Sequence, residues 1–280
     1  MTKLAIIGGS GLYQVEGLEV VNEHTVETPF GETSDKVVEV KTDFGNCFFL
    51  ARHKRGHRIT PSEVNYRANI FALKKLGVRN IVSISAVGSL KDEHEPSKFV
   101  IPTQFIDWTK GFRARTFFGE GVVGHVSVAE PVDLGLAQRL ESILKEDKVN
   151  FSFGGSYVCI EGPQFSTKAE SNIYRSFGAD LIGMTNVPEA YLAKEAGIAY
   201  STIAMVTDYD CWKEEHCTLE EIMKVMGENN KTANRLIPKI IKSLNEKPIE
   251  PKLENQFAVV TNPEHIPADK KAIIEVLLSK

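Results

Sequence analysis

Short apolar runs alternate along this chain with longer amphipathic stretches, and that alternation constrains the fold more than any other feature. Apolar runs of this length are typical of strands in the interior of a sheet, and amphipathic stretches are typical of the helices that cover one. The sequence therefore predicts an α/β fold built on one large sheet. We expect strands at residues 4–7, 37–40, 47–51, 80–86, 99–101, 157–160, 181–183 and 198–206.

Helix starts are marked by capping signals. Thr60-Pro61-Ser62-Glu63 has capping-box spacing with proline at the first helical position, and Thr218-Leu219-Glu220-Glu221 repeats the box. A further helix is expected at 188–196, stopped by Gly197. Residues 245–256 have the composition of a linker. We expect this linker to lead to a final helix at 267–278.

Composition excludes several classes of protein. The 280 residues, 42% hydrophobic and 25% charged, can form one large α/β domain or two small ones. A net charge of −4 without a basic block argues against nucleic-acid binding. The four cysteines show no metal-ligand spacing, which favours reduced thiols. The apolar run at 4–7 is too short for a signal peptide or a membrane span, so we expect a soluble, cytoplasmic protein.

Anion-compatible groups follow several predicted strands. A glycine-rich turn, Gly8-Gly9-Ser10-Gly11, follows the first strand, although glutamine at position 14 breaks the dinucleotide fingerprint and disfavours a nicotinamide oxidoreductase. Arg52-His53 and the hydroxyl-rich segment 83–89 also stand at strand ends. Any of these alone is compatible with a purely structural role, but together they favour phosphate. His53 and His57 lack the glutamate of a zinc-protease motif, so we expect no metal.

Asp208 and Asp210 lie at the end of the last apolar run. Their period-two spacing directs both side chains to one side of an extended chain, at the strand end where α/β proteins usually bind ligands. A protonated carboxyl can donate to a purine ring nitrogen and accept from an adjacent amino group, which favours adenine over a 6-oxopurine. Two solvated loop acids are the alternative interpretation. The turn after residue 160 holds Phe165, which either stacks on a base or belongs to the core.

Extended motifs resemble those of the 5′-methylthioadenosine phosphorylases, within the purine nucleoside phosphorylase superfamily. The resemblance covers residues 3–244 in order. Its motifs are Ile-Ile-Gly-Gly-Ser-Gly-Leu from Ile6, Thr-Pro-Phe-Gly from Thr28, Ala-Arg-His from Ala51, Pro-Ser-Glu-Val-Asn-Tyr-Arg-Ala-Asn from Pro61, Ala-Val-Gly-Ser from Ala86, Glu-Gly-Pro-Gln-Phe-Ser from Glu161, Gly-Met-Thr-Asn-Val-Pro-Glu from Gly183 and Thr-Asp-Tyr-Asp-Cys-Trp from Thr207.

The resemblance implies a single nucleoside phosphorylase domain over residues 1–280, with a large mixed central β-sheet covered by helices. It also implies a pentosyl transfer used in purine and methionine salvage. Inorganic phosphate, a co-substrate in an enzyme without cofactor, attacks C1′ of methylthioadenosine and releases adenine and 5-methylthioribose 1-phosphate. Asp208 is then the acid that assists the leaving purine.

Binding roles also follow from the resemblance alone. The implied phosphate ligands are Ser10, Arg52, His53, Ser85, Ala86 and Thr185. The implied adenine and ribose contacts are Phe165, Ser166, Met184, Asp208 and Asp210. The implied 5′ pocket consists of His57, Leu219 and Ile222, completed by His125 and Val260 from a neighbouring subunit of a homotrimer. Ordinary core packing is the alternative reading for Leu219 and Ile222.

Competing functions stay open at this point. A purine nucleoside phosphorylase acting on inosine or guanosine shares the implied fold, and the aspartates argue against it. A nucleoside-binding protein without catalysis needs the purine contacts but not the phosphate set. The partners expected in either case are a small nucleoside and phosphate, with neither nucleic acid nor membrane.

Overall fold

The computed structural model describes residues 3–9, 18–213 and 218–279, with only the backbone of Leu219. Its strands are β1 (Leu4–Gly8), β2 (Glu19–His24), β3 (Val37–Thr42), β4 (Gly45–Ala51), β5 (Asn80–Ser89), β6 (Phe99–Ile101), β7 (Gln104–Trp108), β8 (Phe151–Phe153), β9 (Ser156–Ile160), β10 (Leu181–Gly183) and β11 (Ala199–Tyr209). Its α-helices are α1 (Tyr66–Lys75), α2 (Leu134–Glu146), α3 (Lys168–Ser176), α4 (Asn186–Glu195), α5 (Leu219–Glu246) and α6 (Ala268–Leu278). A short 3-10 helix, η2, spans Pro263–His265.

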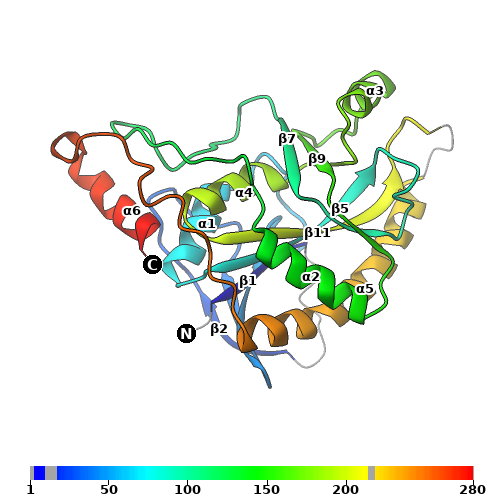
Figure 1. Cartoon of the computed structure of the whole chain (residues 1–280), viewed down its shortest axis with the longest axis horizontal. Coiled ribbons are helices and arrows are strands. Elements are labelled where there is room, and N and C mark those ends of the chain that lie inside the picture. Colours follow the sequence, from blue (N-terminus) through cyan, green and yellow to red (C-terminus); the bar gives the residue numbers. More distant parts are fainter. Residues whose placement is uncertain (1–2, 10–17, 214–217, 280) are drawn as a thin grey trace.

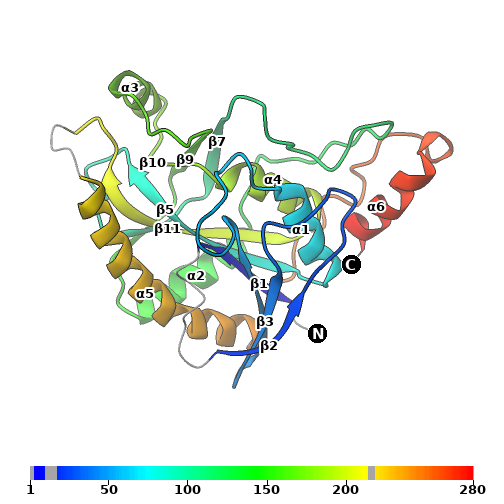
Figure 2. The same cartoon turned by 180° about the vertical axis from the view of Figure 1, so that it is seen from behind.

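The strands form one mixed, 11-stranded sheet in the order β2-β3-β4-β1-β5-β10-β9-β7, with β11, β6 and β8 branching from β5. Helices α2 and α5 cover one face, and α1 and α4 cover the other, as Figures 1 and 2 show from opposite sides. Helix α6 packs on α1 at the far edge. The predicted α/β fold with a large mixed sheet is therefore confirmed.

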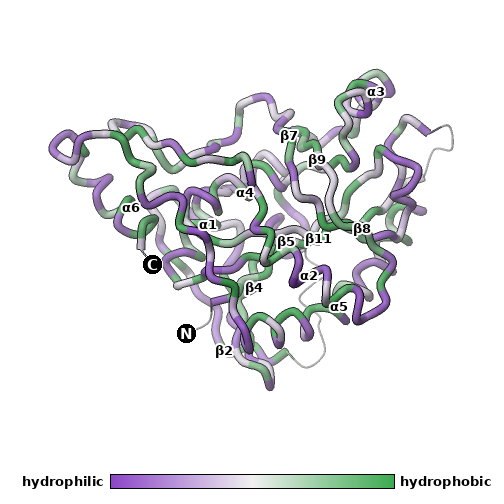
Figure 3. The backbone as a smooth tube through the Cα atoms, in the orientation of Figure 1, coloured by the Kyte–Doolittle hydropathy of each residue, from purple (hydrophilic) through white to green (hydrophobic). Residues whose placement is uncertain are grey.

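The apolar side chains of the central strands explain why helices cover both faces of the sheet. Strand β1 is buried along its whole length, and β11 is buried from Ala199 to Thr207. Figure 3 shows the same contrast, because hydrophobic segments concentrate in the central strands whereas α5 alternates between hydrophobic and hydrophilic residues. A strand that is apolar on both faces must be covered on both faces, which the two helical layers achieve. No helix in the described ranges is both long enough and apolar enough to span a bilayer.

One capping prediction is confirmed and another is wrong. Thr218 caps α5 with a reciprocal capping box to Glu221. By contrast, the residues after Thr60 form turns, and α1 begins only at Tyr66. Glu63 does bond back to the Thr60 amide and hydroxyl, but Asn65 accepts a hydrogen bond from the Ala68 amide and so sets the actual helix start.

Candidate active site

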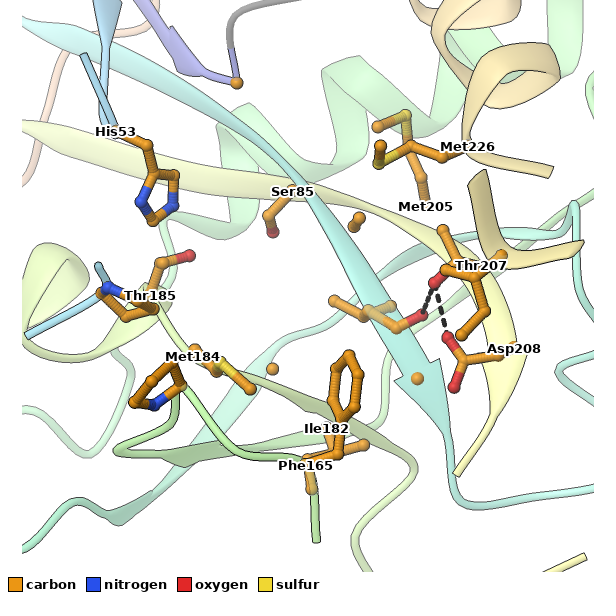
Figure 4. A pocket seen from close by; sticks show the side chains of 18 of the residues that line it. His53, Ser85, Phe165, Ile182, Met184, Thr185, Met205, Thr207, Asp208 and Met226 are labelled. Carbon is orange, nitrogen blue, oxygen red and sulfur yellow. Dashed lines mark hydrogen bonds between the residues drawn. The ribbon is translucent and has the colours of Figure 1, made fainter. Parts of the chain in front are cut away.

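A cavity of about 540 Å³ opens where the central sheet divides. The ends of β4, β5, β9, β10 and β11 and the first turns of α5 contribute its walls. In the view of Figure 4, His53 and Thr185 lie at one end and Asp208 at the other, with Ser85 between them. The cavity thus joins the strand ends that the sequence singled out.

A gap in the pairing of β5 creates this opening. On the edge of β5 opposite β11, β1 pairs with residues 80–83 and β10 pairs with Gly88 and Ser89. Residues 84–87 lie between these ladders, and no described strand pairs with them on that edge. Ala86 in this stretch is exposed, in a strand whose other residues are buried apart from the half-buried Gly88.

The pleat of β5 fixes which amides face the gap. The Leu90 amide donates to Asp180 on the β10 side, whereas the Ser89 carbonyl accepts from Asp210 on the β11 side. Backbone groups alternate between the two edges of a strand every residue, so Ala86, like Leu90, directs its N–H away from β11 and into the gap. The cavity therefore contains a main-chain donor at its centre.

Most of the predicted site residues meet in this one cavity. Those that line it are Arg52, His53, His57, Ser85, Ala86, Phe165, Ser166, Met184, Thr185, Asp208, Asp210 and Ile222. Ser10 and the side chain of Leu219 lie outside the described residues. Among the described residues, no group of three or more histidine, cysteine or acidic side chains is arranged to hold a metal ion.

Arg52 is held at the end of β4 by a buried ion pair. Its Nε and Nη2 donate to the two carboxylate oxygens of Glu189 at 2.7 and 2.9 Å, and Nη2 also reaches Ser83 Oγ at 2.7 Å. The Tyr200 hydroxyl donates to the same carboxylate at 2.9 Å. This bidentate pair fixes the plane of the guanidinium group. Among the described residues, no group accepts a hydrogen bond from Nη1 of Arg52, and Arg52 lines the cavity.

Ser85 belongs to the same buried network. Its hydroxyl donates to Asn186 Oδ1 at 3.2 Å, while the Asn186 amide nitrogen bonds to the hydroxyls of Tyr200 and Thr202. Because α4 carries both Asn186 and Glu189, one helix positions Arg52 and Ser85 together. The adjacent Thr185, at the N-cap of α4, makes no side-chain capping bond and lines the cavity instead.

His53 is neutral and presents an acceptor. Burial, reinforced by the Arg52 charge, lowers the pKa of His53 to about 4. Its Nδ1 lies 3.0 Å from the Ile59 carbonyl, and because a carbonyl only accepts, Nδ1 carries the proton. The remaining nitrogen, Nε2, is then unprotonated. His57 stacks on this ring at a centroid distance of 4.6 Å.

Asp208 and Asp210 form an acidic pair at the opposite end. A bulge in β11 between Val206 and Asp208 lets Thr207 line the cavity together with both acids. Burial raises the pKa of Asp208 to about 6. The hydrogen bond from the Thr207 hydroxyl, at 2.6 Å, lowers this pKa, and the Asp210 charge raises it further. Burial also raises the pKa of Asp210. Such carboxyls hold a proton more readily than ordinary ones.

Buried polar atoms at this acidic pair are poorly satisfied. Asp210 Oδ2 and Ser166 Oγ make no hydrogen bond of good geometry with the described residues, although the Ser171 and Ser166 hydroxyls lie close enough to Asp210 to oppose the rise in its pKa. Phe165 stands next to them with 70% of its surface exposed, so it is not the core residue that a lone phenylalanine usually is. Unsatisfied polar atoms beside an exposed ring are suited to a flat ligand with polar edges.

One face of α5 closes the cavity, and sequence reasoning found only its first turn. Ile222, Met223, Met226 and Asn230 line the cavity at helical spacing. Continuing the face of Ile222 by two more turns would have identified these residues. Met205 of β11 also lines the cavity, and Figure 4 places it beside Met226.

His125 and Val260 do not line the cavity. They lie on adjacent surface segments, where the His125 amide donates to Ala258 and the Val260 amide to Val123. Val260 is 61% exposed. A role in binding therefore requires that these segments face the cavity of another subunit.

Comparison with known proteins agrees with this geometry. The model of the phosphorylase superfamily matches residues 3–242. The chain belongs to the phosphorylase superfamily. A superfamily member from Geobacter sulfurreducens, S-methyl-5′-thioadenosine phosphorylase, is 47% identical over 98% of this chain and 97% of its own.

Two solved structures are similar to this chain over most of its length. The crystal structure of a methylthioadenosine phosphorylase from an antarctic soil metagenomic library is 45% identical, with a TM-score of 0.91 and 99% of both chains covered. Methylthioadenosine phosphorylase from Schistosoma mansoni in complex with adenine is 36% identical, with a TM-score of 0.83, and the match covers 88% of this chain and 93% of that one.

Proposed function

We propose that this protein catalyses the phosphorolysis of 5′-methylthioadenosine to adenine and 5-methylthioribose 1-phosphate. The observation that carries the proposal is the layout of one cavity, with phosphate-compatible donors at one end and a raised-pKa carboxyl at the other. The names of the relatives agree with it. Phosphate is the co-substrate, and the reaction transfers a pentosyl group without a cofactor.

Phosphate binds in the gap of β5. Nη1 of Arg52, the hydroxyls of Ser85 and Thr185, and the Ala86 amide supply donors around it, with Ser10 as a further ligand on resemblance alone. His53 Nε2, which is unprotonated, accepts a hydrogen bond from the protonated oxygen of hydrogen phosphate. The site therefore orients the nucleophile so that one unprotonated oxygen attacks C1′.

Adenine binds against Phe165, with Asp210 and Ser166 on its polar edge. Asp208 donates its proton to the purine ring nitrogen as the glycosidic bond breaks, when negative charge develops on the leaving base. Thr207 holds Asp208 Oδ1 by its hydroxyl, which leaves Oδ2 to carry the proton. Met184 lies under the ribose and aligns C1′ between phosphate and base.

The methylthio group occupies the apolar end formed by α5. Ile222 and Met223 offer apolar side chains without hydrogen-bond donors, which suit a thioether, and His57 borders the same space. Leu219 belongs to this pocket by resemblance. In a homotrimer, His125 and Val260 of a neighbouring subunit complete it, which accounts for the exposure of Val260. We propose a cytoplasmic location, with the nucleus as a second compartment.

Release of adenine from methylthioadenosine, measured with and without phosphate and with inosine as a control, tests the proposal. We expect release only when phosphate is present, and none of the base from inosine. Release without phosphate identifies a hydrolase, cleavage of inosine means that the acidic pair does not select adenine, and no release at all favours a binding protein.

A further inference from the structure

Arg113 is a buried arginine that touches several walls of the cavity without lining it. It lies in the long connection between β7 and α2, which Figure 1 shows running out towards α6 and back. Its side chain is only 1% exposed. A charged group is rarely buried to this extent unless each of its donors is used, so its partners indicate its role.

The guanidinium binds main-chain carbonyls on two separate segments. Nη1 donates to the carbonyls of Met184 and Val187 at 2.6 and 2.9 Å, and Nη2 donates to the carbonyl of Glu161 at 2.8 Å. The first segment carries Met184 and Thr185 into the cavity. The second opens the turn that carries Phe165.

The ion pair of Arg113 with Glu161 uses Nε, so Nη1 and Nη2 are available for the main-chain carbonyls. Arg113 Nε lies 3.1 Å from the Glu161 carboxylate, which also accepts from Ser62 Oγ and from the Lys110 amide, each at 2.6 Å. Although burial opposes it, these hydrogen bonds and the Arg113 charge lower the pKa of Glu161. Ser62 adjoins Pro61, which lines the cavity, so a further wall is tied to the same group.

The turn that carries Phe165 and the segment that carries Met184 are closely packed, so a shift of one displaces the other. A Cβ built on Gly162, whose φ is +64°, would lie 2.4 Å from Met184 Sδ. The turn that carries Phe165 therefore packs directly on the ribose wall, and the guanidinium bridges the same two elements from behind. The ladder between β9 and β10 ends at Cys159 and Gly183, and beyond it the Arg113 side chain and this close contact hold the two segments at a fixed distance.

We propose that Arg113 is a positioning residue that fixes the distance between the purine wall and the ribose and phosphate wall. Only arginine offers donors in a rigid planar fork that can reach both carbonyl sets and the carboxylate at once. Lysine keeps the charge but concentrates its donors at one atom. The inference rests on the proposed function, since the distance matters for a substrate that spans both walls.

The kinetic consequence is a loss of turnover without a comparable loss of binding to either wall. A misplacement of about 1 Å between reacting groups lowers the rate by roughly 10²-fold. Adenine alone contacts one wall and phosphate alone the other, so we expect each to bind the variants with affinities within about threefold of the original. A merely structural arginine would not produce this split.

Arg113→Met and Arg113→Lys test the proposal, with Arg139→Met as the matched control. Arg139 also donates to main-chain carbonyls, those of Ser243 and Lys247, each at 3.1 Å, but at the far end of α5. We expect kcat to fall about 10²-fold in both Arg113 variants and to change less than about twofold in the control. Titration calorimetry with adenine and with inorganic phosphate supplies the binding constants.

Turnover of Arg113→Lys near that of the unmodified enzyme would overturn the proposal, as would single-ligand affinities that fall as far as kcat. If Arg113→Met does not fold, Arg113→Lys decides alone. Absence of phosphorolysis in the unmodified protein overturns the proposed function instead.

Discussion

Replacing Asp208 with asparagine removes the proton that the proposed mechanism delivers to the departing purine. Loss of a general acid lowers rates by about 10² to 10⁴-fold. The amide keeps the shape and a hydrogen-bonding edge, so we expect the lower half of that range, about 10² to 10³-fold in kcat/KM, or about 3 to 4 kcal/mol of transition-state stabilisation. Phosphate affinity should stay within about threefold, because the acid lies at the other end of the cavity.

The pH dependence of this effect follows from the raised pKa of Asp208. With a pKa of about 6, the carboxyl is about 90% protonated at pH 5 and about 10% protonated at pH 7. Its contribution to catalysis is therefore present below pH 6 and declines as pH rises. The activity ratio of the unmodified enzyme to Asp208→Asn should fall about tenfold between pH 5 and pH 7.

Steady-state kinetics on methylthioadenosine at saturating phosphate measure this ratio. Phosphate and adenine also titrate, but they do so identically for both proteins, so the ratio isolates Asp208. A ratio near one at every pH would refute the assignment of the acid. A large ratio that does not vary between pH 5 and pH 7 would mean that Asp208 binds the purine without transferring a proton.

Further predictions concern the remaining walls. Phe165→Ala should weaken adenine binding by about 1 to 3 kcal/mol in calorimetry while leaving the melting temperature nearly unchanged, since the ring is 70% exposed; unchanged adenine affinity would exclude stacking. Ile222→Asp should reduce kcat/KM on methylthioadenosine more than on adenosine, because it places a charge beside the thioether; equal losses would remove Ile222 from the 5′ pocket. Glu189→Gln should lower the free energy of unfolding by about 3 to 5 kcal/mol in denaturant titrations, because Arg52 stays buried without its counter-charge, and phosphate should restore part of the loss; full stability without phosphate would contradict this.

Local signals explain what the sequence could predict. Strand ends such as Arg52-His53 and Asp208 carry polar side chains directly after apolar runs, and parallel strand ends meet at one edge of a sheet. The cavity that joins them is consistent with that reasoning. The final apolar run was expected to end before Asp208, yet β11 continues to Tyr209 through its bulge. The acids consequently lie in and beside the strand, with Thr207 added to the site.

Features that depend on contacts between residues far apart in the chain could not be predicted from the sequence. Strand β2 is exposed along most of its length and shows no buried run, so only its pairing with β3 reveals it. Asn65 outcompetes the capping signal at Thr60 because its amide also donates to the carbonyls of Phe30 and Glu32. Arg113 stands in no motif, and its partners are remote in sequence. Such long-range hydrogen bonds leave no periodic pattern to recognise.

The unpaired edge of β5 gives the substrate a structural role as well as a chemical one. Between residues 84 and 87 this edge of β5 has no partner strand among the described residues, so its main-chain donors depend on water or a ligand for their hydrogen bonds. In the proposed complex, hydrogen phosphate accepts from the Ala86 amide and takes the place of the missing strand. The sheet of the phosphate-bound protein therefore has more of its main-chain hydrogen bonds satisfied than the sheet of the free protein. Occupancy and resistance to unfolding should rise together in this enzyme.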